Sequence, residues 1–235
     1  MTLARRLPLK ARQVVRGLLD RLVDTYATKS YSQEGEDMIL RRVFGLKNDG
    51  FYVDVGAHHP RRYSNTNHFY KLGWSGINIE PSPDAIKLFR TRRPRDVNLQ
   101  LGVSDEAGLL EYFVFEEPAI NTFDPALARS RIAATPYRLL ETVAVPVEPL
   151  GKILARHIPP GREIDFFSID VEGLDYKVLR SNDWERFRPL CVMVEALGTP
   201  LERAQDSDVY AYMSSHEYEL IAKTFNTLIF RKRAA

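Results

Sequence analysis

Four acidic residues stand at or near the carboxyl ends of predicted β-strands, where their side chains could act on one ligand. They are Asp54, Glu80, Asp170 and Glu195. In an open parallel sheet, ligands bind beyond the carboxyl ends of the strands. Unpaired buried carboxylates are costly, so packing alone does not account for four of them at equivalent positions. We therefore expect the four carboxylates to meet in one cleft.

Two of the acids are separated by a single residue, which suggests general-base or metal chemistry. If the chain stays extended, Asp170 and Glu172 point the same way, and each carboxylate raises the pKa of the other. For a base that activates a hydroxyl group we rank Asp170 first, then Glu172, then His59. Together with Glu195 or His59, the two carboxylates could also bind Mg²⁺ or a similar hard ion, with Asp170 and Glu195 as the first candidates for its ligands. Alternatively, Asp170 only orients an ammonium group and Glu172 caps the next helix.

The loop after the first predicted strand reads Asp54-Val55-Gly56-Ala57-His58-His59-Pro60. Gly56 lets the backbone approach a ligand closely, but a dinucleotide site needs a fuller set of glycines. The loop therefore favours a nucleoside ligand without phosphates. Glu80 follows Gly56 by about 20 residues, the spacing of an acid that binds ribose hydroxyls. The alternative is that Glu80 caps the segment that begins at Pro81.

Other polar segments near the expected cleft have two interpretations each. Ser104 and Asp105 follow the third strand and either hold an adenine ring or form an ordinary turn. Asn65 and Thr66 either bind acceptor hydroxyls or cap the next helix. Glu36 lies in an acidic cluster after Ser32, which is a plausible N-cap, and either faces the cleft or stabilises the helix dipole.

The elements that would position these residues alternate between strands and helices. Short apolar runs predict strands over 51–55, 76–80, 97–101, 164–170 and 190–195, and a closing antiparallel pair over 219–222 and 227–230. Helical patterns cover 66–72, 83–91, 176–180 and 207–216. This order predicts an α/β fold with a mostly parallel sheet, helices on both faces and a C-terminal antiparallel hairpin. Residues 113–147 look irregular, with a hairpin and then an insertion near the acceptor cleft.

The N-terminal segment 1–30 forms a separate arm before the domain at 31–235. Apolar residues at helical spacing and several arginines predict a basic amphipathic helix over Leu3–Val23. This helix either packs on the domain or on a second copy, giving a homodimer, or lies on an anionic membrane surface. No run of about 18 apolar residues exists, so we expect a cytoplasmic protein, with peripheral contact to the inner face of the membrane as the open alternative.

Composition narrows the classes of partner. The net charge of +2 gives no argument for nucleic acid as a partner. The single cysteine, Cys191, excludes a disulfide framework within the chain and lies in an apolar run, where we expect it to be buried.

Several segments together resemble the FkbM-type methyltransferase family. They are Ser32-Gln33-Glu34-Gly35-Glu36-Asp37, Tyr52-Val53-Asp54-Val55-Gly56-Ala57-His58, Tyr63-Ser64-Asn65-Thr66, Gly73-Trp74-Ser75-Gly76-Ile77-Asn78-Ile79-Glu80-Pro81 and Ile169-Asp170-Val171-Glu172-Gly173. The resemblance runs from about residue 31 to 197 and covers neither the arm nor most of 118–137, where a variable insertion would select the acceptor.

The resemblance implies a Rossmann-like class I methyltransferase fold with a seven-stranded sheet. It also implies S-adenosylmethionine as cofactor and methyl transfer to a hydroxyl group, of a sugar in a glycan or of another natural product. By resemblance, Asp54, Gly56 and His58 would line the methionine part of the cofactor. Glu80, followed by Pro81, would hold the ribose, and Ser104 and Asp105 would lie near the adenine.

Two other functions are consistent with the same fold. A sugar-nucleotide oxidoreductase or epimerase would need a phosphate-binding glycine loop and a Tyr-x-x-x-Lys pair, and the sequence has neither. A non-catalytic module that binds glycan or protein would not need the acids that the sequence retains. The acceptor, whether small molecule or glycan, is not encoded by fold or cofactor site.

Overall fold

The computed structural model describes residues 8, 10, 15, 24 and 26–234. The chain divides into two compact units, residues 1–30 and residues 31–235. The helix expected over Leu3–Val23 lies mostly outside the described residues, so its membrane and dimer roles remain predictions. In the described part of the chain, no helix combines the length and apolar character needed to cross a bilayer.

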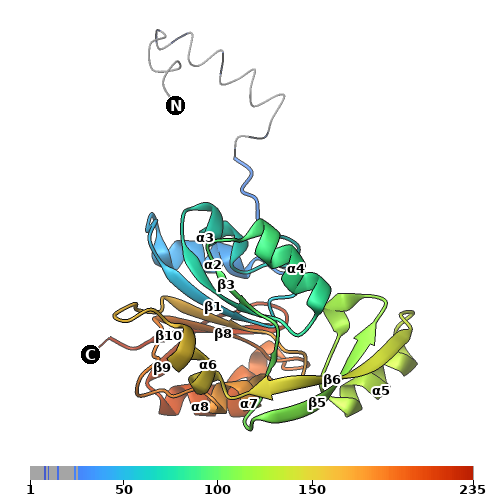
Figure 1. The fold of residues 1–235 in the computed structure, drawn as a ribbon. Coiled ribbons are helices and arrows are strands. Elements are labelled where there is room, and N and C mark those ends of the chain that lie inside the picture. The colour runs from blue at the N-terminus through green and yellow to red at the C-terminus, as the bar shows by residue number, and fades with distance from the viewer. Residues whose placement is uncertain (1–7, 9, 11–14, 16–23, 25, 235) are drawn as a thin grey trace. The chain divides into compact units, whose positions relative to one another are not determined.

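The second unit is built around a seven-stranded sheet in the order β3-β2-β1-β7-β8-β10-β9 (Figure 1). The parallel strands are β3 (Val97–Leu99), β2 (Ser75–Ile79), β1 (Phe51–Val55), β7 (Phe166–Ile169) and β8 (Cys191–Glu195). The closing strands β10 (Thr227–Lys232) and β9 (Tyr218–Lys223) pair antiparallel. The predicted sheet and its C-terminal hairpin are confirmed. Strands β1, β7 and β8 are buried along their whole length, as expected for central parallel strands.

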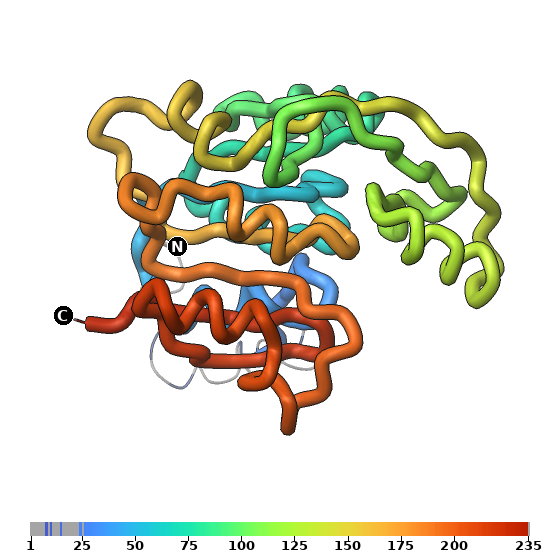
Figure 2. Tube along the Cα trace, turned by 90° about the horizontal axis from the view of Figure 1, so that it is seen from below, coloured from blue at the N-terminus to red at the C-terminus, as the bar shows by residue number. Residues whose placement is uncertain are grey.

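Helices cover both faces of this sheet because alternate strand residues point to opposite sides. On one face lie α2 (Glu36–Phe44), α3 (Asn67–Lys71) and α4 (Pro83–Arg92), and on the other lie α6 (Leu150–His157), α7 (Asp175–Arg180) and α8 (Asp208–Ser215) (Figures 1 and 2). Tyr52 packs in the cluster that includes Leu40 of α2, whereas its neighbour Val53 packs in the cluster that includes Leu150 of α6. Cys191 is free and buried in the same cluster as Leu40 and Tyr52, and its burial was predicted.

A second, three-stranded sheet has the order β4-β6-β5 and was not predicted. It contains β4 (Gly102–Val103), β5 (Gly108–Phe115) and β6 (Leu139–Glu148), and the link between β5 and β6 carries the 3-10 helix η2 (Pro118–Ile120) and α5 (Pro125–Ala134). Residues 113–147 are therefore ordered elements rather than an irregular segment. The signals for α5 are present in the sequence, since Asp124 accepts from two backbone amides as N-cap and Pro125 follows it. A further 3-10 helix, η3 (Leu201–Asp206), precedes α8.

Candidate active site

A cleft of about 780 Å³, counted out to its mouth, opens at the carboxyl ends of β1, β2 and β7. We call it the main cleft. One side is formed by the loop after β1 and by residues 79–81, and another by residues 101–103. The three-stranded sheet and its link contribute Tyr112 and residues in the range 118–123.

The backbone around the main cleft adopts conformations that few residue types tolerate. Gly56 has φ 77°, and a Cβ atom there would lie 1.7 Å from the carbonyl oxygen of Asp170. Three non-glycine residues that line the cleft, His58, Tyr63 and Glu172, also have positive φ, of 51°, 53° and 54°. Strained backbone of this kind is concentrated at functional sites. The tight passage between Gly56 and Asp170 fixes the loop after β1 against the end of β7.

Glu80 lies directly after β2, is buried and lines the main cleft. Its Oε2 accepts from the backbone N–H of His58 at 2.8 Å, and its Oε1 accepts from the backbone N–H of Ser82 at 2.9 Å. Burial raises the pKa of Glu80 to about 7. Each carboxylate oxygen has two lone pairs, so each can accept one more hydrogen bond from a ligand.

A second, smaller pocket adjoins the main cleft, and we call it the polar pocket. All of its lining residues have polar or ionisable side chains: Gln33, Glu34, Glu36, Tyr63, Asn65, Asp170, Glu195, Asn226 and Thr227. Gln33, Tyr63, Asn65 and Asp170 line the main cleft as well. The two hollows therefore meet at these four residues.

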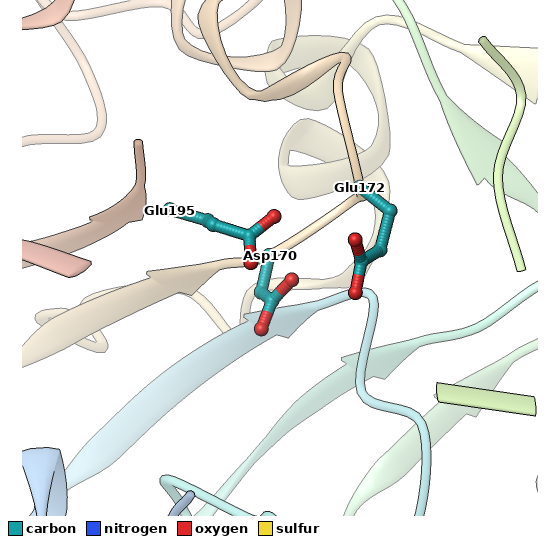
Figure 3. A group of neighbouring side chains, drawn as sticks. All are labelled: Asp170, Glu172 and Glu195. Carbon is teal, nitrogen blue, oxygen red and sulfur yellow. The ribbon is translucent and has the colours of Figure 1, made fainter. Parts of the chain in front are cut away.

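Three of the predicted acids converge where the hollows meet (Figure 3). Asp170 follows β7, Glu172 lies two residues further on, and Glu195 ends β8; one oxygen from each lies within 4.8 Å of the other two. Burial and then the neighbouring Asp170 carboxylate raise the pKa of Glu195 to about 11. Burial and then Glu172 raise the pKa of Asp170 well above its usual range. Burial and mutual repulsion therefore disfavour the ionised forms of these neighbouring carboxyl groups.

The extended geometry expected from Asp170 to Glu172 does not persist, because β7 ends at Ile169 and Glu172 has a left-handed backbone. Glu172 is instead held from the β5–β6 link. Its carboxylate forms an ion pair with Arg131 of α5, and its carbonyl oxygen accepts from the Thr122 hydroxyl at 2.6 Å. The interpretation that Glu172 caps the next helix finds no support, because Asp175 accepts from the amides of Val171 and Gly173 in this turn.

A buried network supports the loop after β1 from behind. Asp54 accepts from the Thr66 hydroxyl at 2.7 Å, and burial raises its pKa. Arg93 donates to Thr66 at 2.6 Å, to Ser64 at 2.7 Å and to the carbonyl of Pro60 at 2.6 Å. Thr66 is fully buried and lines neither hollow, so it stabilises the site and does not contact an acceptor.

Three other predicted site residues lie outside both hollows. His59 Nδ1 accepts from the backbone amides of Arg61 and Arg62, so this ring is held in a turn and lines neither the main cleft nor the polar pocket. Ser104 donates to Asp105, and both line a separate hollow beside β5. The chain leaves the main cleft here because the amide of Ser104 pairs with Glu148 of β6. Residues 101–103 line the cleft in their place.

The remaining predicted residues line the hollows. Asp54, Gly56, His58, Glu80 and Pro81 line the main cleft, and Glu36 and Glu195 line the polar pocket. In the polar pocket, Glu36 accepts from the hydroxyl of Thr224 at 3.0 Å.

Several residues of the site stand in sequence contexts that did not mark them as functional. Asn226 lies in the turn of the C-terminal hairpin and Thr227 begins β10, and polar residues are ordinary at such positions. Gln33 and Tyr63 stood within the quoted segments but carried no chemical signal of their own. Arg131 had no signal at all, because its partner Glu172 is 41 positions away in the sequence.

Comparison with known proteins agrees with this geometry. No curated protein matches the sequence. The family model described as the methyltransferase FkbM domain matches residues 54–220, which is more than half of the chain. The match begins at Asp54, so the Ser32–Asp37 segment of the resemblance lies outside it, while the glycine loop and the three converging acids lie inside. The chain therefore belongs to the FkbM methyltransferase family.

Proposed function

We propose that this methyltransferase moves a methyl group from S-adenosylmethionine to a hydroxyl group of a polar acceptor, a sugar or a similar polyol. The observation that carries the proposal is the junction of two hollows with different linings. The main cleft has the glycine loop and the buried acid of a nucleoside site, and the polar pocket has only polar and ionisable lining residues.

The main cleft fits the cofactor. Glu80 presents a buried carboxylate that has lone pairs for ribose hydroxyls. His58 lines the cleft, and its Nε2 is buried without a hydrogen-bond partner. Burial lowers the pKa of His58 to about 4, so the ring is neutral at pH 7 and does not repel a sulfonium. Gly102 and Val103 supply a small, apolar wall for an adenine ring.

The polar pocket favours an acceptor rich in hydroxyl groups over an apolar one. Asn65 and Glu36 offer donors and acceptors at its walls. An apolar acceptor would displace water from these polar groups and offer no hydrogen bonds in return, which costs free energy.

Asp170 is the residue best placed to receive the acceptor's proton, because it lines both hollows. When bound, S-adenosylmethionine supplies an already activated methyl group on a sulfonium. The acceptor oxygen would form the new C–O bond while the C–S bond of the cofactor breaks. The electron pair of the C–S bond would return to sulfur. Asp170 takes the hydroxyl proton, and the walls of the polar pocket hold the oxygen in line.

The test is methyl transfer itself, followed as S-adenosylhomocysteine formation with a panel of sugars, polyols and apolar alcohols. We expect turnover with members of the first two groups and a loss of 100-fold or more in Asp170→Asn, the usual contribution of a general base. Binding of S-adenosylhomocysteine to this variant should stay within a few-fold of wild type. Glu163→Gln, at an exposed acid remote from the site, is the matched control. Preference for apolar alcohols, or full activity in Asp170→Asn, would contradict the proposal.

A further inference from the structure

The three carboxyl groups at the junction outnumber the cations that pair with them among the described residues. Among the described residues, Arg131 is the cation that forms an ion pair with this cluster, through Glu172. In the described part of the chain, the buried Oε2 of Glu195 has no hydrogen-bond partner. Buried carboxylates of this kind are stable only when they are protonated, paired or bound to a metal.

Glu195 gives an independent indication of a ligand. Its side chain is 7 % exposed, its Oε2 is buried and has no hydrogen-bond partner, and it points toward Asp170 and Glu172 (Figure 3). Buried polar atoms almost always have a partner. An orphaned carboxylate oxygen aimed at two further carboxylates therefore indicates that a positively charged group belongs between them.

The spacing of the oxygens fits a hard divalent cation. One oxygen from each residue lies within 4.8 Å of the other two. Two oxygens on opposite sides of Ca²⁺ are about 4.6–5.2 Å apart, and those on Mg²⁺ about 4.0–4.2 Å, since the respective bond lengths are about 2.3–2.6 Å and 2.0–2.1 Å. These are the largest separations that two ligands of one ion can have, so a mutual limit of 4.8 Å is compatible with three carboxylates around one hard divalent cation. Its all-carboxylate donor set suits Mg²⁺, Mn²⁺ and Ca²⁺ rather than a thiolate- or imidazole-seeking metal.

We propose that Asp170, Glu172 and Glu195 bind a hard divalent cation at the junction of the main cleft and the polar pocket. Three protein ligands leave positions of a six-coordinate ion for water and for an acceptor hydroxyl, which enters from the polar pocket. This role rests on the proposed function. At the junction, the ion stabilises the negative charge that develops on the acceptor oxygen as the acceptor hydroxyl loses its proton. Asp170 gives one carboxylate oxygen to the ion and keeps the other for that proton.

Arg131 acquires a positioning role in this arrangement. Its guanidinium holds one oxygen of Glu172 and also donates to the carbonyl of Ile120 at 2.6 Å. The β5–β6 link therefore orients a metal ligand although it contributes none itself, as outer partners of metal ligands commonly do.

The test is Mn²⁺ binding to the full chain, followed by electron paramagnetic resonance of the free ion after removal of metals with a chelator. We expect one saturable site, at least tenfold weaker binding in Glu195→Gln, and a change of less than twofold in Glu163→Gln. Mg²⁺ should compete for the same site. Glu195→Gln preserves the shape of the side chain, and a thermal melt of each variant verifies folding.

Binding of S-adenosylhomocysteine is measured on the same metal-free samples, so that the two proposals can fail separately. Cofactor binding without a Mn²⁺ site, or Mn²⁺ binding that Glu195→Gln leaves unchanged, overturns the metal proposal and leaves the methyltransferase proposal standing. A Mn²⁺ site that Glu195→Gln weakens supports the metal proposal even if no sugar acceptor is methylated. If the enzyme turns over an acceptor, loss of that turnover in the chelator-treated protein and its recovery with Mg²⁺ further support the metal proposal.

Discussion

Glu80 illustrates how a single residue connects the sequence to the site. Its position after the second strand and its distance from the glycine loop were enough to predict a ribose-binding acid. The structure adds that both of its oxygens already accept backbone hydrogen bonds and that the side chain is buried. The same burial has a consequence for stability that is measurable without any substrate.

We expect the wild type to lose stability relative to Glu80→Gln as the pH rises from 4.5 to about 7. Burial, with a smaller contribution from Asp54, raises the pKa of Glu80 from 4.5 to about 7, although the amides of Ser82 and His58 oppose the shift. Across this window the unfolded chain releases the proton that the folded chain retains, so the free energy of unfolding falls with pH and then levels off. The difference should amount to roughly 3 kcal/mol.

Urea unfolding of both proteins at a series of pH values measures this difference. Glu163→Gln, at an exposed acid, should follow the wild type throughout. A difference between the wild type and Glu80→Gln that stays constant from pH 4 to 8 would show that Glu80 ionises normally in the folded protein.

At the scale of elements, the loop after β1 is held by an arginine that no local pattern revealed. Arg93 is 1 % exposed, ends α4 as its C-cap and donates to three groups in residues 60–66. Its ion-pair partner Asp96 also accepts from the hydroxyl of Tyr52 at 2.6 Å. This network ties α4, β1 and the loop into one unit behind the main cleft.

Arg93→Lys should destabilise the fold by about 3 kcal/mol, because an ammonium group cannot replace a guanidinium that donates to several acceptors at once. The neighbouring Arg92→Lys, at an exposed position, should change stability by less than about 0.5 kcal/mol. Denaturant midpoints of the two variants provide the comparison. Equal midpoints would mean that the network contributes little to holding the loop.

Elements with strong local patterns were predictable, and those defined by partners were not. The buried runs of β1, β7 and β8 appear in the sequence as apolar stretches, whereas α6, whose packing on the sheet buries only Leu150, Ile153 and Leu154, was missed. In the site, too, residues with a local sequence pattern were predictable and residues defined by distant partners were not. Acids at strand ends were predictable from topology, but the pairing of Glu172 with Arg131 depends on the fold of the β5–β6 link. His59 and Ser104 were misplaced because a shift of one or two residues in a loop redirects the side chain.

At the scale of the whole molecule, the family match and the positions of the two hollows both place the functional site at one edge of the sheet. The family match runs from the end of β1 to the start of β9, and both hollows open at the carboxyl ends of parallel strands that end within that range. Residues from the start of α2 and from the β9–β10 turn complete the polar pocket, so its lining is assembled from segments far apart in the chain. The central claim is that this edge binds the methyl donor.

Calorimetric titration of the full chain with S-adenosylhomocysteine tests that claim most directly. We predict saturable binding at one site, at least tenfold weaker binding in Glu80→Gln through loss of a charged hydrogen-bond acceptor, and unchanged binding in Glu163→Gln. NAD should not bind, because the loop lacks the glycines of a dinucleotide site. No binding of S-adenosylhomocysteine to the wild type, with or without Mg²⁺, or binding that Glu80→Gln leaves intact, would contradict the account.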